Sequence, residues 1–191
     1  TCYGYNYSQQ IYTAAEMTAG GAISGGIISQ IKFMPNAATA NANFLSWNIY
    51  LGNTALGNLS GTTGWVPVGS MTQVFSGNIP ALTAGGWMTL NLSTPFMWTG
   101  GNLVVAVDEN TAGYTCTAAW RSFTVAAAAG PRGMLYYSDT VNPDPNAPPT
   151  ANYNSTTIRA QIQMTMTGGA PCSGTPNAGV ASASVANACS G

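Results

Sequence analysis

The sequence predicts an all-β protein, an antiparallel β-sandwich of the jelly-roll type with eight to nine strands. Short segments alternate apolar and polar residues with a period of two, and clusters of Gly, Pro and Asn separate them. No segment keeps a helical period over three turns. A jelly roll suits this number of strands and the long connections better than a seven-stranded immunoglobulin domain does.

The predicted strands follow one another along the chain. In the N-terminal stretch TCYGYNYSQQIY, alternation places Tyr3, Tyr5 and Tyr7 on one strand face. The stretch YTAAEMTAGG (12–21) has room for a turn or two of helix at most. Further strands are predicted at 27–34, 44–51, 70–75, 87–92, 103–107, 119–125, 133–138 and 158–166.

Two of these segments make sharper predictions. LVVAV (103–107) is apolar throughout, which is typical of a central strand covered on both faces. IRAQIQMTM (158–166) alternates strictly, so it predicts one half-buried strand. Its buried face would carry Ile158 and Ile162, and its solvent face Arg159 and Gln163.

The composition changes at Gly168. Residues 1–167 predict one β-sandwich domain, and 191 residues are enough for one full core. Residues 168–191 are small and flexible, so we interpret them as a linker and the opening segment of a following module.

The four cysteines predict disulfides in an exported protein. Three pairings are open, of which Cys172 with Cys189 and Cys2 with Cys116 is the simplest.

Charge is scarce, with four Lys/Arg, five Asp/Glu and no His, for a net charge of −1. No basic patch is available for nucleic acid or an anionic membrane. No apolar run approaches the ~20 residues of a membrane-spanning helix. Without His, neither a Ser-His-Asp nor a Cys-His arrangement can form, and zinc hydrolase motifs fail for the same reason. We therefore expect no enzymatic activity.

Asp108 and Glu109 stand side by side at the end of the apolar strand. Adjacent strand residues point to opposite faces, so these acids cannot flank one glycosidic bond. One interpretation is a calcium site with Asp108, Glu109 and Asn110 as ligands, helped by carbonyls of the NPDPN loop. A turn in which Asp and Asn cap the backbone, with Gly113 at positive φ, is favoured over the metal, as is an ion pair. The candidate partners for such a pair are Arg121, Arg132 and Arg159.

Tyrosines are the other functional signal. Tyr and Trp rings stack on sugars and suit protein interfaces, where one side is apolar and the other wet. The candidate ligand-binding residues are Tyr3, Tyr5, Tyr7, Tyr136 and Tyr137. Ordinary packing inside the sandwich is the alternative interpretation.

Several stretches together resemble a known module. These are YSQQIYTAAEM, SWNIYLGNT, GWVPVGSMTQVFSG, FMWTGGNLVVAVDENTAGY and LYYSDTVNPDPNAPP. They resemble a β-sandwich module of secreted, multidomain surface proteins in the Bacteroidetes, over roughly residues 5–167. PCSGTPNAGVASASVANACSG resembles the opening of the Ig-like repeats that commonly follow it. DTV (139–141) resembles an O-glycosylation acceptor pattern of these bacteria, which makes Thr140 the candidate acceptor.

The resemblance implies export through the type IX secretion system and an adhesin-like role. We therefore expect a non-enzymatic extracellular module that serves adhesion or stalk and fibre building. Its partners would be a surface glycan, a protein ligand, neighbouring modules or copies of itself. The alternative is a carbohydrate-binding module attached to a secreted hydrolase or peptidase, with calcium as the one cofactor to consider.

Overall fold

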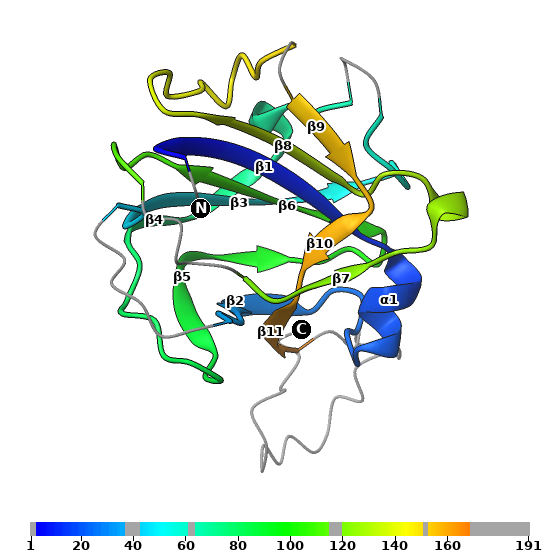
Figure 1. The fold of residues 1–191 in the computed structure, drawn as a ribbon. Helices are drawn as coiled ribbons and strands as arrows, with labels where there is room; N and C mark the ends of the chain where they lie inside the picture. The colour runs from blue at the N-terminus through cyan, green and yellow to red at the C-terminus, as the bar shows by residue number, and fades with distance from the viewer. Residues whose placement is uncertain (1–2, 37–42, 61–63, 115–119, 151–152, 169–191) are drawn as a thin grey trace, which may run out of the picture.

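The computed structural model describes residues 3–36, 43–60, 64–114, 120–150 and 153–168. In this part the chain forms eleven strands, helix α1 (Ala14–Ala19) and two 3-10 turns, η1 (Val68–Ser70) and η2 (Ala127–Ala129) (Figure 1). The strands are β1 (Tyr5–Tyr12), β2 (Ile27–Phe33), β3 (Ser46–Thr54), β4 (Thr72–Asn78), β5 (Met88–Met97), β6 (Asn102–Glu109), β7 (Ser122–Thr124), β8 (Gly133–Ser138), β9 (Tyr153–Thr156), β10 (Ile158–Ala160) and β11 (Ile162–Thr167).

The predicted all-β class is confirmed, with more strands than the eight or nine expected. β9 forms where only a loop was predicted, and the single strand predicted at 158–166 is divided into β10 and β11. All strand pairs are antiparallel. The chain passes repeatedly between a six-stranded sheet (β4-β3-β6-β1-β8-β9) and a three-stranded sheet (β11-β2-β5).

The two sheets form the layers of a sandwich. In Figure 1 the six-stranded sheet lies above the three-stranded one, and β7 and β10 form a small two-stranded sheet at the side near α1. Strands are spaced about 4.8 Å apart, so a sheet of three can cover only about half the width of a sheet of six. Part of the inner face of the large sheet is therefore left for other segments to enclose.

Hydrophobic clusters cover both faces of the large sheet. The cluster between the sheets includes Leu103, Val105 and Val107 of β6. The cluster on the outer face includes Val104 and Ala106 of the same strand. This outer cluster is completed by Leu59, Trp65 and Val66 from the connection that follows β3. The prediction that 103–107 is a central strand covered on both sides is confirmed.

Helix α1 is short and begins with a capping box. The Oγ1 of Thr13 accepts a hydrogen bond from the amide N of Glu16 (3.3 Å), and a carboxylate oxygen of Glu16 accepts one from the amide N of Thr13 (2.8 Å). Such reciprocal bonds satisfy amide groups that the first turn of a helix leaves without partners. They also fix the direction of the Glu16 carboxylate.

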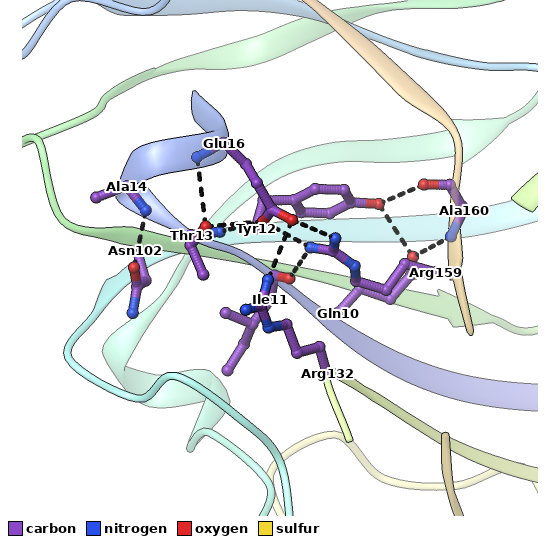
Figure 2. A network of polar contacts seen from close by, with 10 residues as sticks. All are labelled: Gln10, Ile11, Tyr12, Thr13, Ala14, Glu16, Asn102, Arg132, Arg159 and Ala160. Carbon is purple, nitrogen blue, oxygen red and sulfur yellow. Dashed lines mark hydrogen bonds and ion pairs between the residues drawn. The ribbon is translucent and has the colours of Figure 1, made fainter. Parts of the chain in front are cut away.

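That carboxylate is the centre of the polar network in Figure 2. Arg159 donates two hydrogen bonds to it, at 3.0 and 2.6 Å, and Arg132 donates a third at 3.0 Å. Hydrogen bonds from Arg159 hold the pKa of Glu16 down at about 2. Arg159 also donates to the backbone oxygen of Ile11, and its guanidinium lies 4.9 Å from the ring centre of Tyr12 and 4.5 Å from that of Phe123.

The burial of Arg159 reverses one sequence prediction. The alternation placed Ile158 inside and Arg159 in solvent, but Arg159 is 1% exposed and Ile158 is 50% exposed. The reason is that β10 pairs with β7 and not with the three-stranded sheet, so its inner side faces Glu16 and Tyr12. Ile162, Met164 and Met166, after the break at Gln161, do pack against the core as predicted.

Two further bonds hold β10 beside β1. The side-chain oxygen of Gln10 accepts a hydrogen bond from the amide N of Ala160 (2.6 Å), and the hydroxyl of Tyr12 donates to the carbonyl of Ala160 (2.7 Å). The network therefore joins α1, β1, β10 and the segment at Arg132 around one anion.

Replacing Glu16 with Gln is expected to destabilise the fold. The variant leaves the buried guanidinium of Arg159 without a counter-charge, which costs roughly 2 kcal/mol of unfolding free energy; the value is moderate because Glu16 is partly exposed. Urea denaturation at pH 7 measures it. Asp144→Asn is the matched control, because it removes an exposed carboxylate and keeps an oxygen that can accept from Asn146. Equal stability of the two variants would contradict the role of the network.

Candidate ligand-binding site

Asp108 and Glu109 end strand β6 and point to opposite faces of the large sheet. In register, Asp108 lies between Tyr7 of β1 and Asn48 of β3, whereas Glu109 lies between Asn6 and Trp47. Tyr7 belongs to the outer cluster and Trp47 to the cluster between the sheets. The acids are therefore separated by the sheet itself, as strand alternation requires.

Asp108 is part of a strand-end turn. One of its carboxylate oxygens accepts hydrogen bonds from the amide groups of Asn48 (3.1 Å) and Asn110 (2.8 Å). Burial raises the pKa of Asp108. A carboxylate oxygen of Glu109 accepts from the amide N of Thr111 (2.8 Å), and Gly113 has a φ of +87°. The turn is capped, as the sequence favoured, but Glu109 and Asn110 bond the backbone here, whereas the carboxylate of Asp108 bonds only side chains.

The structure does not bring the predicted calcium ligands together. Asp108 and Glu109 point away from each other. Asn110 does lie beside Asp108 and beside Asn142 of the NPDPN loop, but its side-chain oxygen already accepts a hydrogen bond from Asn142 (2.7 Å). Within the described ranges no three His, Cys, Asp or Glu residues lie close enough to hold a metal ion. The ion pair with arginine is not formed either, because Arg132 and Arg159 both bind Glu16.

Glu109 instead belongs to a row of side chains that crosses the inner face of the large sheet. Tyr137 of β8, Asn6 of β1, Glu109 of β6 and Trp47 of β3 are successive register partners. The neighbouring row contains Ser8 in the same strand as Asn6. This face is the part of the six-stranded sheet that extends beside the small sheet of β7 and β10.

A cavity of about 460 Å³ lies on this face. Asn6, Ser8, Glu109, Trp47 and Trp120 line it, and β10 closes one side with Ile158, Arg159 and Ala160. The exposed Asn154 of β9 lies at its rim, so the cavity opens to solvent there. We call it the inner-face cavity.

Several polar groups of the inner-face cavity lack partners in the described part of the chain. Asn6 is 7% exposed and Ser8 is half-buried, and neither side chain forms a hydrogen bond there. The second carboxylate oxygen of Glu109 and the indole Nε1 of Trp47 are buried and also unpaired among these residues. Buried polar groups in native proteins are almost always hydrogen-bonded, so the two buried exceptions at Glu109 and Trp47, with the unpaired side chains of Asn6 and Ser8 beside them, indicate a place for a ligand or ordered water.

Aromatic rings form the wall beside these polar groups. Phe33, Trp47 and Trp120 meet edge to face, with ring centres 5.3 to 6.0 Å apart. Trp120 is half-buried, so part of its surface remains accessible. At the other end of the row, Tyr137 stacks on Tyr3 with ring centres 3.9 Å apart.

Burial also shapes the electrostatics of the inner-face cavity. Desolvation raises the pKa of Glu109 to about 7, against the opposing effect of its hydrogen bonds with Thr111. Arg159 lines the cavity, but its guanidinium is bound to Glu16. Near pH 7 the carboxyl of Glu109 is therefore divided between its neutral and its ionised form, and the cavity carries at most this one negative charge.

The five tyrosines predicted to bind ligand divide between the two faces. Tyr3 is 36% exposed and Tyr137 half-buried, next to the row on the inner face. Tyr5 is half-buried. Tyr7 and Tyr136 are buried in the outer cluster, where Tyr7 stacks on Trp65 (5.1 Å between ring centres). Tyr7 and Tyr136 are thus not accessible to a ligand, because the connection after β3 covers them.

Other predicted sites are exposed or lie outside the described residues. Thr140 is exposed in a turn where the hydroxyl of Ser138 accepts hydrogen bonds from the amides of Thr140 and Val141, so it is accessible for glycosylation, which stays a prediction. Cys2, Cys116, Cys172 and Cys189 fall outside the described residues, as does 169–191, the rest of the predicted linker and following module.

Comparisons with family models, curated proteins and solved structures found no match for this chain. The resemblance to a Bacteroidetes surface module therefore stays a prediction. Among the described residues, no helix has the length and hydropathy that crossing a membrane would require.

The raised pKa of Glu109 predicts a pH-dependent stability. Below pH 4.5 the carboxyl is neutral in both the folded and the unfolded chain. As the pH rises from 4.5 to about 7, the unfolded chain ionises first, so stability falls, on the order of 3 kcal/mol in total. Burial also raises the pKa of Asp108, so ionisation of Asp108 lowers the stability in the same direction as the pH rises. Urea denaturation at pH 5 and pH 8 should show most of this loss in the wild type and much less in Glu109→Gln. An equal loss in both proteins would contradict it.

Proposed function

We propose that this chain is a non-enzymatic, extracellular binding module of a bacterial cell-surface or secreted protein, and that it serves adhesion by holding a ligand in the inner-face cavity. One observation carries the proposal: unpaired polar groups of Asn6 and Ser8 lie beside an accessible aromatic wall in a cavity of about 460 Å³. Ligand sites in proteins typically combine such walls with a few placed polar groups.

Hydrolysis is the less favoured alternative. Cleavage of a glycosidic bond by paired carboxylates needs two acids on opposite sides of one bond. Among the described residues that line the inner-face cavity, Glu109 is the single carboxylate, and Asp108 lies across the sheet. This arrangement supports a module that holds its ligand without transforming it.

Stalk or fibre building is also less favoured. A spacer needs a rigid sandwich and joining surfaces, and it has no use for an internal cavity with unsatisfied polar groups, which lower stability. The cavity is the feature that a binding role explains and a spacer role does not. The extracellular setting is supported by the four cysteines of the chain.

Filling the inner-face cavity should weaken adhesion. Ser8→Trp places a bulky ring in the cavity, and Ser76→Trp is the matched control on an exposed position of edge strand β4. Beads coated with each protein would be washed over mucin-coated and fibronectin-coated plates. We expect wild-type and Ser76→Trp beads to be retained on at least one surface and Ser8→Trp beads to lose about tenfold in affinity. No retention of the wild type, or equal retention of all three, would contradict the proposal.

A further inference from the structure

We infer that the ligand of the inner-face cavity is a neutral carbohydrate, bound against Trp120 and beside Asn6 and Ser8. The inference rests on the proposed binding function and names its ligand class. It follows from the order of side chains along the row, from the kind of polar groups in it and from its charge.

The row has aromatic rings at its two ends and polar groups between them. From Tyr137 on β8 to Trp47 on β3 the row crosses three strand spacings, or about 14 Å. Trp120 adds a more accessible ring beside Trp47 (5.3 Å between ring centres), and Tyr3 adds one beside Tyr137. The cavity lining includes the Trp47 and Trp120 end of the row and neither Tyr137 nor Tyr3, so the apolar face of a sugar ring would stack at the Trp120 end.

The polar groups between the rings suit hydroxyls. The side-chain amide of Asn6 offers both donors and an acceptor, and the hydroxyl of Ser8 offers one donor and acceptor sites. Sugar hydroxyls also donate and accept at the same oxygen, so they can satisfy groups of both kinds at once. The buried unpaired acceptor of Glu109 is on the register partner of Asn6, and the buried unpaired donor of Trp47 is one strand further along the row.

The charge of the cavity argues against ionic ligands. An anionic ligand would need a free cation, and the one arginine in the lining is occupied by Glu16. An ammonium group would need either the carboxylate of Glu109, whose unpaired oxygen is buried, or a cage of ring faces. The rings of Phe33, Trp47 and Trp120 contact one another edge to face and leave no such cage between them. A neutral polyhydroxyl compound is the class that remains.

Indole signals in NMR spectra of the full chain test the inference without a mutation. The chain has five Trp residues, and the Nε1 groups of Trp65 and Trp98 are already bonded to backbone oxygens of Pro149 and Gly101. Titration with neutral oligosaccharides of glucose, mannose and galactose should shift the indole signals of Trp47 and Trp120. The signals of Trp65 and Trp98 should stay in place and serve as internal controls.

Affinity measurements on variants complete the test. Trp120→Ala should weaken oligosaccharide binding at least tenfold, and Asn6→Ala about as much. Tyr114→Ala, which removes an exposed ring outside the cavity lining, should leave binding unchanged. Trp120 also packs on Trp47 and Phe33, so thermal unfolding of each variant checks that the variant is folded. If Trp120→Ala does not fold, the affinity of Asn6→Ala alone decides the test.

The outcomes separate the ligand class from the binding function. If a peptide or a quaternary ammonium compound shifts the Trp47 and Trp120 signals and no neutral oligosaccharide does, the carbohydrate inference is overturned while the cavity remains a binding site. If no compound shifts them and the beads show no retention, both the inference and the proposed function fail. Shifts at Trp65 and Trp98 alone would also overturn the inference.

Discussion

The ion pair between Glu16 and Arg159 is the interaction on which the arrangement of this protein depends. The two residues lie 143 positions apart in sequence, and their contact brings the start of the chain to its last strands. Burying a guanidinium is unfavourable unless its charge and hydrogen bonds are met. Here two carboxylate oxygens, a backbone carbonyl and two aromatic rings meet the charge and the terminal N–H groups, while the Nε of Arg159 stays unpaired among the described residues. A chain with so few charges has placed three of them at one point.

This contact also explains why the inner-face cavity exists. It draws β10 against β1 and turns the chain at Gln161, so residues 158–160 leave the three-stranded sheet and stand beside the wider one. If 158–166 had continued as one strand, the inner face of β1 and β8 would have lost this wall. The residues of the network and those of the cavity overlap at Gln10, Arg159 and Ala160. Stability of the fold and shape of the site are thus linked through the same strand.

The sequence predicted burial correctly where the residues of one segment are enough to determine it. The apolar run at 103–107 predicted a central strand, because such a run is stable only when both faces are covered. Alternation also placed Asp108 and Glu109 on opposite faces. Alternation could not tell which face of β1 is accessible. Tyr7 and Tyr136 were therefore predicted to bind ligand, although the connection after β3 buries them. Asn6 and Ser8, on the accessible face, were missed. Likewise, a period of two says nothing of a partner such as Glu16, which reverses the burial of Ile158 and Arg159.

A crystal structure of the protein without added ligand tests the central claim most directly, because the network and the inner-face cavity are seen together. The account predicts electron density for the Arg159 guanidinium between the rings of Tyr12 and Phe123, with ordered solvent bonded to Asn6 and Ser8 in an open cavity. Density that places Arg159 in bulk solvent, with residues 158–166 as one continuous strand over a filled inner face, would contradict it.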